Sequence, residues 1–118
     1  YMGGWEAGNL GTSYMSWMFK RAPGFMDVVT YTGDGTASHA VPHNLEAVPE
    51  LLIVKHRTGG TRDWHVYTQA TGNQSDMRLN NNNSASTGFT YWANTTPTAT
   101  HFYVSNVPAA SLTVQGLY

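Results

Sequence analysis

Short runs of apolar and β-branched residues recur along the chain with a period of two, and turn residues separate them. The most apolar run is Leu51–Lys55. Pro49 stands just before this run, where its missing backbone N–H does not interrupt a strand. In Asp63–Gln69 the residues alternate, with Trp64 and Val66 on one face. Both segments therefore predict β-strands rather than helices.

The same pattern predicts further short strands at Tyr14–Phe19, Met26–Tyr31, Thr36–Val41, Met77–Leu79, Phe89–Trp92, Thr100–Ser105 and Ser111–Tyr118. A helix would fit only in Asn44–Glu50, where Pro42 and Pro49 leave too little room. About eight short strands, spaced by roughly ten residues, are typical of an all-β fold. We expect an antiparallel β-sandwich that resembles a jelly roll.

The length of 118 residues fits one domain. We expect residues 25–118 to form a single β-sandwich domain. Residues 1–24 contain the predicted strand Tyr14–Phe19, and we interpret them as the closing strand of a preceding unit or as a segment between units. The chain begins with Tyr1 rather than Met, which indicates a fragment of a longer chain or a processed product.

Charged residues make up only 11% of the chain, and the net charge is −1. Globular domains usually contain about 25% charged residues, so polarity here comes from Thr, Ser, Asn and Gly. The balance gives no basic surface for nucleic acid, and no apolar run has the length of a membrane span. The chain contains no cysteine, which excludes disulfide, thiol and zinc–cysteinate chemistry. We expect neither nucleic-acid binding nor membrane insertion.

Five histidines are the first candidates for chemistry: His39, His43, His56, His65 and His101. His39 and His43 are four residues apart, which is a metal-ligand spacing only on a helix, and this segment is predicted to be extended. His56 and His65 flank a possible hairpin. We interpret the histidines as exposed strand residues and expect no metal and no cofactor. For His43, a hydrogen bond that stabilises a turn is the preferred role.

The carboxylates offer little more for catalysis. A glycosidase needs two carboxyl groups about 5 to 9.5 Å apart across a cleft. Asp27 and Asp63 could approach each other in a sheet, but no feature of the sequence indicates a raised pKa for either group. Asp34 lies in a Gly-Asp-Gly turn and lacks the other acidic ligands of a calcium loop. We expect no enzymatic activity and no catalytic residue.

Aromatic residues, 13% of the chain, are the remaining signal. Exposed aromatic rings stack on sugars, and polar neighbours bind the sugar hydroxyls. The candidates for such a glycan or contact surface are Trp64, Tyr67, Tyr91, Trp92 and Asn94. The alternative for Trp64 and Trp92 is a place in the core of a thin sandwich. Interfaces between subunits enrich Trp and Met, and Trp5, Met15, Trp17 and Met18 fit that use.

The segment Phe25–Gly35 and the residues that follow it resemble a known family. The resemblance continues through His43-Asn44-Leu45, Val48-Pro49, Leu52-Ile53-Val54-Lys55, Asp63-Trp64-His65-Val66-Tyr67, Leu79-Asn80 and Tyr91-Trp92, and covers about residues 14 to 105. These residues are similar to a β-rich domain of unassigned function in tail-fibre-like proteins of marine and other bacteriophages. That domain often recurs in tandem beside lectin-like modules. Its members usually have a small residue, often Gly, where this chain has Glu46.

The resemblance implies a non-catalytic virion structural module of tail-fibre or spike type, which acts in particle assembly and attachment to the host surface. A carbohydrate-binding, lectin-like adhesion module is the first alternative, and a capsid decoration protein is the second. The expected partners are other copies of the chain in a homo-oligomer such as a trimer, other virion proteins and, for adhesion, a host-surface glycan. The expected location is the tail or surface of the virion, after synthesis in the host cytoplasm.

Overall fold

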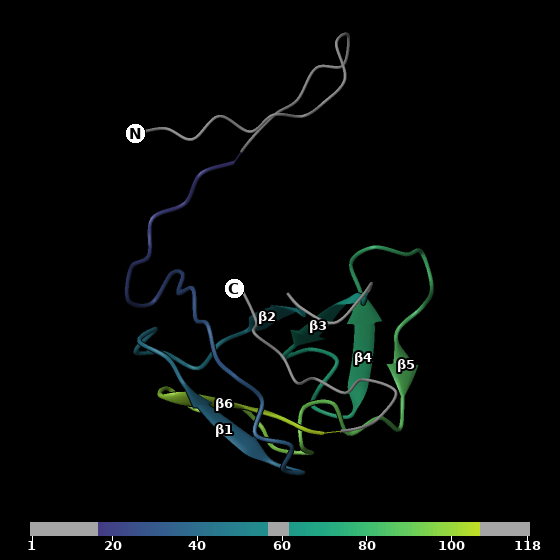
Figure 1. Ribbon diagram of the computed structural model, residues 1–118. Helices are drawn as coiled ribbons and strands as arrows, with labels where there is room; N and C mark the ends of the chain where they lie inside the picture. The colour runs from purple at the N-terminus through teal and green to yellow at the C-terminus, as the bar shows by residue number, and fades with distance from the viewer. Residues whose placement is uncertain (1–16, 57–61, 107–118) are drawn as a thin grey trace, which may run out of the picture.

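The computed structural model describes residues 17–56 and 62–106 (Figure 1). The described residues form six strands, in the order β1 (His39–Pro42), β2 (Leu51–Lys55), β3 (Trp64–Thr68), β4 (Ser75–Arg78), β5 (Ser86–Thr87) and β6 (His101–Val104). They contain no helix, which confirms the all-β expectation. Within these two ranges, nothing helical has the length and apolar character of a membrane span.

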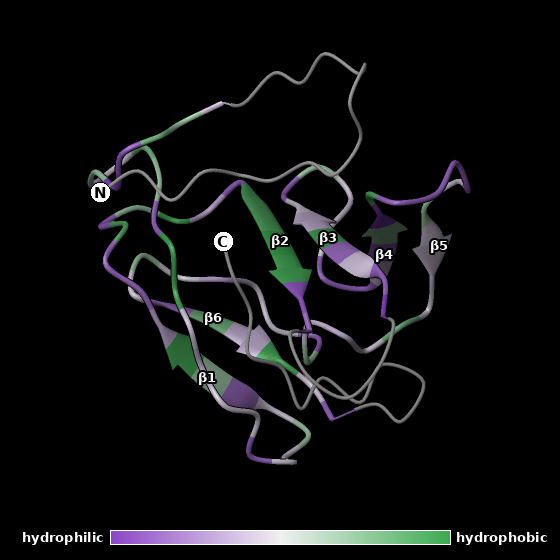
Figure 2. Cartoon of the chain, turned by 45° about the horizontal axis from the view of Figure 1, so that its top comes forward, coloured by the Kyte–Doolittle hydropathy of each residue, from purple (hydrophilic) through white to green (hydrophobic). Residues whose placement is uncertain are grey.

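The strands are arranged in two antiparallel sheets. One sheet has the strand order β2-β3-β4-β5, and the other pairs β1 with β6. Figure 1 shows β1 and β6 lying together below the four-stranded sheet. In Figure 2, β2 is coloured as an apolar strand up to its last residue. The run that looked most like a strand in the sequence is thus placed at the start of the larger sheet.

One hydrophobic core joins the two sheets. Its members come from β1, β2, β3, β6 and a turn before β6: Val41, Leu52, Val54, Tyr67, Tyr91, Trp92, Phe102 and Val104. In the β2–β3 pair, Leu52 lies opposite Tyr67 and Val54 lies opposite His65. These four residues therefore share the inner face, because paired residues in an antiparallel sheet point to the same side. The pleat of the paired strands, rather than a strict alternation in the sequence, divides the two faces, because β2 is apolar over four consecutive residues and Val66 of β3 is also buried.

The predicted strand Phe89–Trp92 is wrong, although its aromatic residues are buried. Residues 91–94 form a turn, and Ala93 and Asn94 have positive φ angles of 52° and 51°. The indole Nε1–H of Trp92 donates to the carbonyl of Ser75 at 2.9 Å. Aromatic residues prefer strands because they pack well there, and in this chain a turn delivers the same side chains to the core.

The predicted strand Met26–Tyr31 is also wrong, apart from an isolated bridge between Ala22 and Met26. The Asp27 carboxylate accepts the backbone N–H groups of Val28 and Asn44, each at 2.8 Å. A side chain thus takes the place of a neighbouring strand as hydrogen-bond partner. Tyr31 from this segment still packs against the core.

Other predicted strands differ at their ends. In the Thr36–Val41 segment the strand starts only at His39, because the Asp34 carboxylate holds the N–H and hydroxyl of Thr36 in a turn. Trp17 to Phe19 is irregular, and residues 14–16 lie outside the described residues, as does the whole predicted strand Ser111–Tyr118. The described part of the chain therefore contains six strands instead of about eight.

The His43-Asn44-Leu45 motif forms a tight turn after β1. The Nδ1 atom of His43 accepts the N–H of Leu45 at 3.2 Å, and its Nε2 atom lies 3.2 Å from the carbonyl of Thr98. This geometry fits the preferred structural role of His43. The next residue, Glu46, has a φ of 58°, in the left-handed region that favours glycine. Glycine at this position would adopt the same φ without a steric penalty.

Glu46→Gly is expected to raise the free energy of unfolding by about 0.5–1 kcal/mol, because glycine adopts a positive φ without a steric penalty. Chemical denaturation of the purified chain measures the change. Ala47→Gly is the matched control, because Ala47 has no positive φ, and it should lower stability by increasing the freedom of the unfolded chain. Equal effects of the two substitutions would contradict the proposed strain at Glu46.

Candidate functional site

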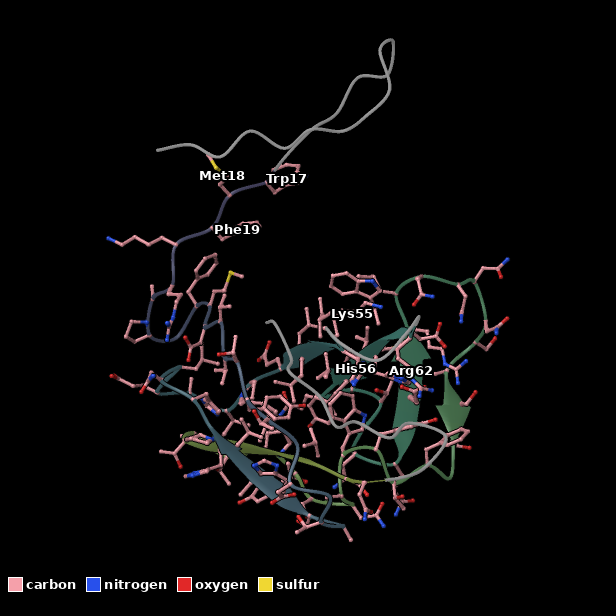
Figure 3. All side chains as sticks on the ribbon, viewed as in Figure 1. Trp17, Met18, Phe19, Lys55, His56 and Arg62 are labelled. Atoms are coloured by element: carbon pink, nitrogen blue, oxygen red, sulfur yellow. The ribbon has the colours of Figure 1, made fainter. Side chains whose placement is uncertain are left out.

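The most exposed apolar surface of the described chain is the N-terminal apolar segment, which we define as Trp17, Met18, Phe19 and Phe25. Their exposed fractions are 73%, 86%, 60% and 65%. The rings of Phe19 and Phe25 lie 6.1 Å apart at a tilted angle. Figure 3 shows Trp17, Met18 and Phe19 on a stretch of chain that projects away from the two sheets.

The base of this segment is fixed to the body of the protein. Gly24 donates its N–H to the carbonyl of Leu45 at 2.6 Å, and Ala22 and Met26 exchange backbone hydrogen bonds. The Nε–H of Arg21 donates to Asp27 Oδ1 at 2.6 Å. Backbone and ionic contacts therefore hold the turn, while the apolar side chains remain in solvent.

The exposed area is large for a monomeric protein. A large apolar side chain has roughly 150–250 Å² of surface, so the four residues together expose on the order of 500 Å². A standard interface buries about 800 Å² on each partner. The N-terminal apolar segment could therefore supply more than half of one side of an interface.

The structure describes only part of the predicted subunit interface. Trp17 and Met18 are exposed, as an interface in the isolated chain requires, whereas Trp5 and Met15 lie outside the described residues. Phe19 and Phe25 were not among the predicted residues. Phe19 belongs to the same aromatic run, and Phe25 follows a Pro-Gly turn, so their place beside Trp17 could have been considered from the sequence.

The predicted glycan surface is not formed as a single patch. Tyr67, Tyr91 and Trp92 are 2%, 2% and 1% exposed and belong to the core. A buried ring has no face for a sugar, so these three residues are corrected to core residues. Asn94 is exposed in the turn, and Trp64 is 36% exposed. Among the aromatic residues predicted for the glycan surface, Trp64 alone keeps a face at the surface.

Trp64 lies at the start of β3, where its ring faces the Lys55 ammonium group at 5.6 Å from the ring centroid. Lys55 also donates a short hydrogen bond to the carbonyl of Arg62. The side chain of Asn80 makes two hydrogen bonds to the start of β3. Its Oδ1 accepts the N–H of Trp64 and its Nδ2 donates to Asp63, each at 2.8 Å. The Asp63-Trp64 and Leu79-Asn80 motifs are thus one hydrogen-bonded unit.

On the inner face of β3 and β4 lies a cluster of charged residues, which we call the Asp76 cluster: Asp63, His65, Asp76 and Arg78. His65 and Asp76 are buried, whereas the side chains of Asp63 and Arg78 are each 35% exposed. His65 Nδ1 lies 2.8 Å from Asp76 Oδ1. The Nε–H of Arg78 donates to Asp76 Oδ2 at 3.2 Å, and its Nη1 lies 3.1 Å from Asp63. Asp76 is 2% exposed and His65 is 5% exposed. The cluster therefore neutralises a carboxylate that the fold has removed from water.

Charge and hydrogen bonding in the Asp76 cluster shift the pKa values of its members. The hydrogen bond to Asp76 raises the pKa of Arg78, and the Asp63 charge adds to the effect. The hydrogen bond from Asn80 lowers the pKa of Asp63 most strongly. Burial opposes this shift, and the nearby Arg78 charge lowers the pKa further. Burial raises the pKa of Tyr91. All three shifts favour the ionisation states that stabilise the fold.

A His–Asp pair is also the arrangement that orients a histidine in catalysis. Here the ring of Tyr91 packs against His65 at 4.9 Å between centroids, and only 5% of His65 is exposed. The pair therefore joins β3 to β4, where His65 is directly opposite Arg78. Sequence analysis missed this cluster, because its two halves, at β3 and β4, are 11 to 15 positions apart. They come together only through the pairing of the two strands, which the sequence analysis did not predict.

His39 and His101 have separate neighbours, whereas the buried Nδ1 atom of His56 has no hydrogen-bond partner among the described residues. His39 Nδ1 lies 3.3 Å from Asp34 Oδ1, although the geometry does not make a good hydrogen bond. His101 Nδ1 lies 3.0 Å from the hydroxyl of Thr100. In residues 17–56 and 62–106, no group of three or more metal-ligating side chains lies together. His39 and His101 therefore have individual contacts within strands and turns.

Asp27 and Asp63, the two carboxylates considered for catalysis, have different partners. Burial opposes ionisation of Asp27 most strongly, but hydrogen bonds from the Asn44 and Val28 backbone and from Arg21 together lower its pKa. A general acid in a glycosidase needs a raised pKa. Since both Asp27 and Asp63 have lowered values, each is suited to a structural ion pair.

Stability should decrease at acid pH. Asp27 and Asp63 have folded pKa values below the ordinary value of 3.8. Their contribution to stability is therefore complete above the unfolded pKa and is lost as the pH falls through the lower folded values. Thermal unfolding at pH 7, 4 and 2.5 should show the decrease below pH 4. Asp27→Asn should lower stability at pH 7 and flatten the acid dependence, whereas an unchanged acid dependence would contradict the role of Asp27.

Arg78→Met should lower the free energy of unfolding by about 2 kcal/mol, because the Asp76 carboxylate would lose a partner while remaining buried. The estimate is at the lower end for buried pairs, since the Arg78 side chain is 35% exposed. Urea denaturation measures the effect. Arg62→Met, at an exposed position, is the control and should change stability by less than about 0.5 kcal/mol. Equal losses would show that Asp76 does not depend on Arg78.

Comparison with curated proteins and with solved structures finds no significant match. A family model described as "Domain of unknown function (DUF7483)" matches residues 6–116. The match includes both sheets, the N-terminal apolar segment and the Asp76 cluster. The chain therefore belongs to the DUF7483 family.

Proposed function

We propose that this chain is a non-catalytic structural module of a virus particle, of tail-fibre or spike type, which acts in assembly and host-surface attachment. The observation that carries the proposal is the N-terminal apolar segment, held at its base and exposed at its side chains. Such a surface is typical of a subunit contact. The resemblance of the chain to a domain of phage tail-fibre-like proteins supports the setting on the virion.

The partners that fit this surface are other copies of the chain, in a homo-oligomer such as a trimer, and other virion proteins. The low charge of the chain supports close contact between copies, because only 11% of its residues are charged. Apolar contact then meets little repulsion. We place the module at the tail or surface of the particle, after synthesis in the host cytoplasm.

The state of the carboxylates supports a role without catalysis. Asp27 forms an ion pair with Arg21, and Asp63 forms one with Arg78. Asp76 contacts both His65 and Arg78 through its carboxylate oxygens. Each group therefore has a structural partner that a catalytic role would have to displace. These contacts favour a rigid module over an active site.

We also propose that the two sheets are the layers of a β-sandwich of jelly-roll type. The support is the single core, to which β1 and β6 from one sheet and β2 and β3 from the other contribute side chains. Sheets that face each other across one core are the defining feature of a sandwich.

Carbohydrate binding is the alternative that one observation favours. Trp64 is 36% exposed, and the exposed residue Asn80 is hydrogen-bonded to its backbone. An aromatic face beside an amide group is suited to a sugar ring and its hydroxyls. The site would be small, because the other predicted aromatic residues are in the core.

Light scattering of the purified chain should give the mass of an oligomer, which is two or more times the 12.9 kDa of a single chain. The double variant Trp17→Ser/Phe19→Ser should lower this mass, because it removes most of the aromatic surface of the segment. Leu79→Ser is the matched control, since Leu79 is 63% exposed elsewhere, and it should leave the mass unchanged. A wild-type monomer at every concentration would overturn the assembly role, and glycan-array binding that Trp64→Ala abolishes would then favour the alternative.

A further inference from the structure

Strand β2 lies at one edge of the four-stranded sheet. The strand order is β2-β3-β4-β5, and among the described residues no strand pairs with the outer side of β2. An edge strand presents unpaired N–H and C=O groups, which can pair with another chain. The question is which groups of β2 point outward and whether the strand carries any protection.

The pairing with β3 decides which groups point outward. The N–H of Gln69 donates to the carbonyl of Glu50 at 2.8 Å. In an antiparallel pair, hydrogen-bonded positions alternate with non-bonded ones. Leu52 and Val54 therefore bond to β3 as Glu50 does. The backbone N–H and C=O groups of the intervening residues, Leu51, Ile53 and Lys55, point away from β3.

The edge has little of the protection that natural edge strands carry. Short length, proline and charged residues are the usual devices. At the opposite edge, β5 consists of only two exposed polar residues. In β2, four consecutive residues are apolar, and Leu51 is 56% exposed. The one charge, on Lys55, is directed to the Trp64 ring and the carbonyl of Arg62 on its own sheet.

We propose that β2 pairs in antiparallel fashion with β2 of a second copy, with Ile53 directly opposite Ile53 of that copy. The two four-stranded sheets then form one continuous sheet of eight strands, four from each copy. The contact is isologous, because the same strand contributes both sides. It uses a different surface from the N-terminal apolar segment and does not depend on a role in the virion.

The faces of the sheet and the position of Pro49 select this register. A register that shifts by one residue would place inner residues opposite outer residues, so only shifts of two are possible. With Ile53 at the centre, Leu51 faces Lys55 of the second copy, and three pairs each exchange two hydrogen bonds. A shift of two in one direction sets Lys55 opposite Pro49, which has no N–H. The opposite shift takes Leu51 past the end of β2 at Lys55.

The side chains also fit this register. On the outer face, the Ile53 side chains of the two copies meet, and Leu51 lies beside the aliphatic stem of Lys55 of the second copy. On the inner face, Leu52 lies opposite Val54 of the second copy, so both paired side chains are apolar. Both faces therefore favour pairing about Ile53.

Because the chain contains no cysteine, a single introduced cysteine reports this register. In the proposed pair, the Cα atoms of the two Ile53 residues are about 5.5 Å apart, within the disulfide range of about 4.4–6.8 Å. The two Leu51 residues are offset by four positions, or roughly 13 Å. Ile53→Cys should therefore form a disulfide-linked dimer under mild oxidation, and Leu51→Cys should remain mostly monomeric on a non-reducing gel.

Both cysteine variants are made in the full chain, with and without Trp17→Ser/Phe19→Ser. The Ile53→Cys dimer should persist in the double-variant background, which separates the β2 contact from assembly through the N-terminal apolar segment. Equal cross-linking at both positions, or cross-linking at Leu51→Cys alone, would overturn the register.

Amide hydrogen exchange in the chain without cysteine is the second measurement, because it does not depend on disulfide geometry. At high protein concentration the amides of Leu51, Ile53 and Lys55 should exchange several-fold more slowly than at low concentration. The amides of Leu52 and Val54, which already bond to β3, should change less. Concentration-independent exchange at Ile53, together with no cross-linking of Ile53→Cys, would overturn the pairing of β2 with a second copy.

Discussion

Trp92 reaches the core from a turn, and its indole Nε1–H donates to the carbonyl of Ser75, the first residue of β4. Its ring meets Tyr67 of β3 edge-on at 5.7 Å. A buried N–H that loses its acceptor costs about 1–3 kcal/mol, so the indole and the start of β4 must stay together. Since Asp76 follows Ser75 directly, the same contact places the carboxylate on which His65 and Arg78 depend. The hydrogen bond between Trp92 and Ser75 therefore fixes the larger sheet, its buried charges and the core relative to one another.

Polar side chains take over the role of strand neighbours at several joints of this fold. Asp27 binds the backbone of the turn after β1, His43 closes that turn, and Asn80 fixes the start of β3. These residues lie within the part of the chain that the DUF7483 family model matches. Their spacing in the sequence therefore reflects the geometry of hydrogen-bonded turns. In a chain with few charges, each such group has a local structural partner, and little charge remains for the surface.

The sequence predicted the strands whose period is two and whose partners are other strands. Leu51–Lys55 is confirmed without change, and Asp63–Gln69 and Thr100–Ser105 are confirmed with ends shifted by one residue. Met26–Tyr31 and Phe89–Trp92 are also rich in apolar and aromatic residues, but they are not strands. The Asp27 side chain accepts backbone N–H groups in the first segment, and the second runs into a turn. Composition alone cannot distinguish such segments from strands. The burial of Tyr67 follows from its place opposite Leu52. The Asp76 cluster could not be predicted from spacing alone, because it requires the register of β3 on β4.

Because the chain has few charged residues, the cations that it uses in internal contacts are not left to protect its surface. A domain with many charged residues can cover apolar side chains and block open sheet edges with lysine and glutamate. Here the Lys55 ammonium group faces its own sheet and Arg78 is committed to Asp76, so these cations are unavailable for such protection. The N-terminal apolar segment and the β2 edge remain exposed for the same reason, although they lie on different elements. A closed contact at β2 would join two copies, and a second contact through the N-terminal segment could extend them further. A single isologous contact closes a pair, so identical chains that associate through isologous contacts need two such contacts on different surfaces to build an extended assembly.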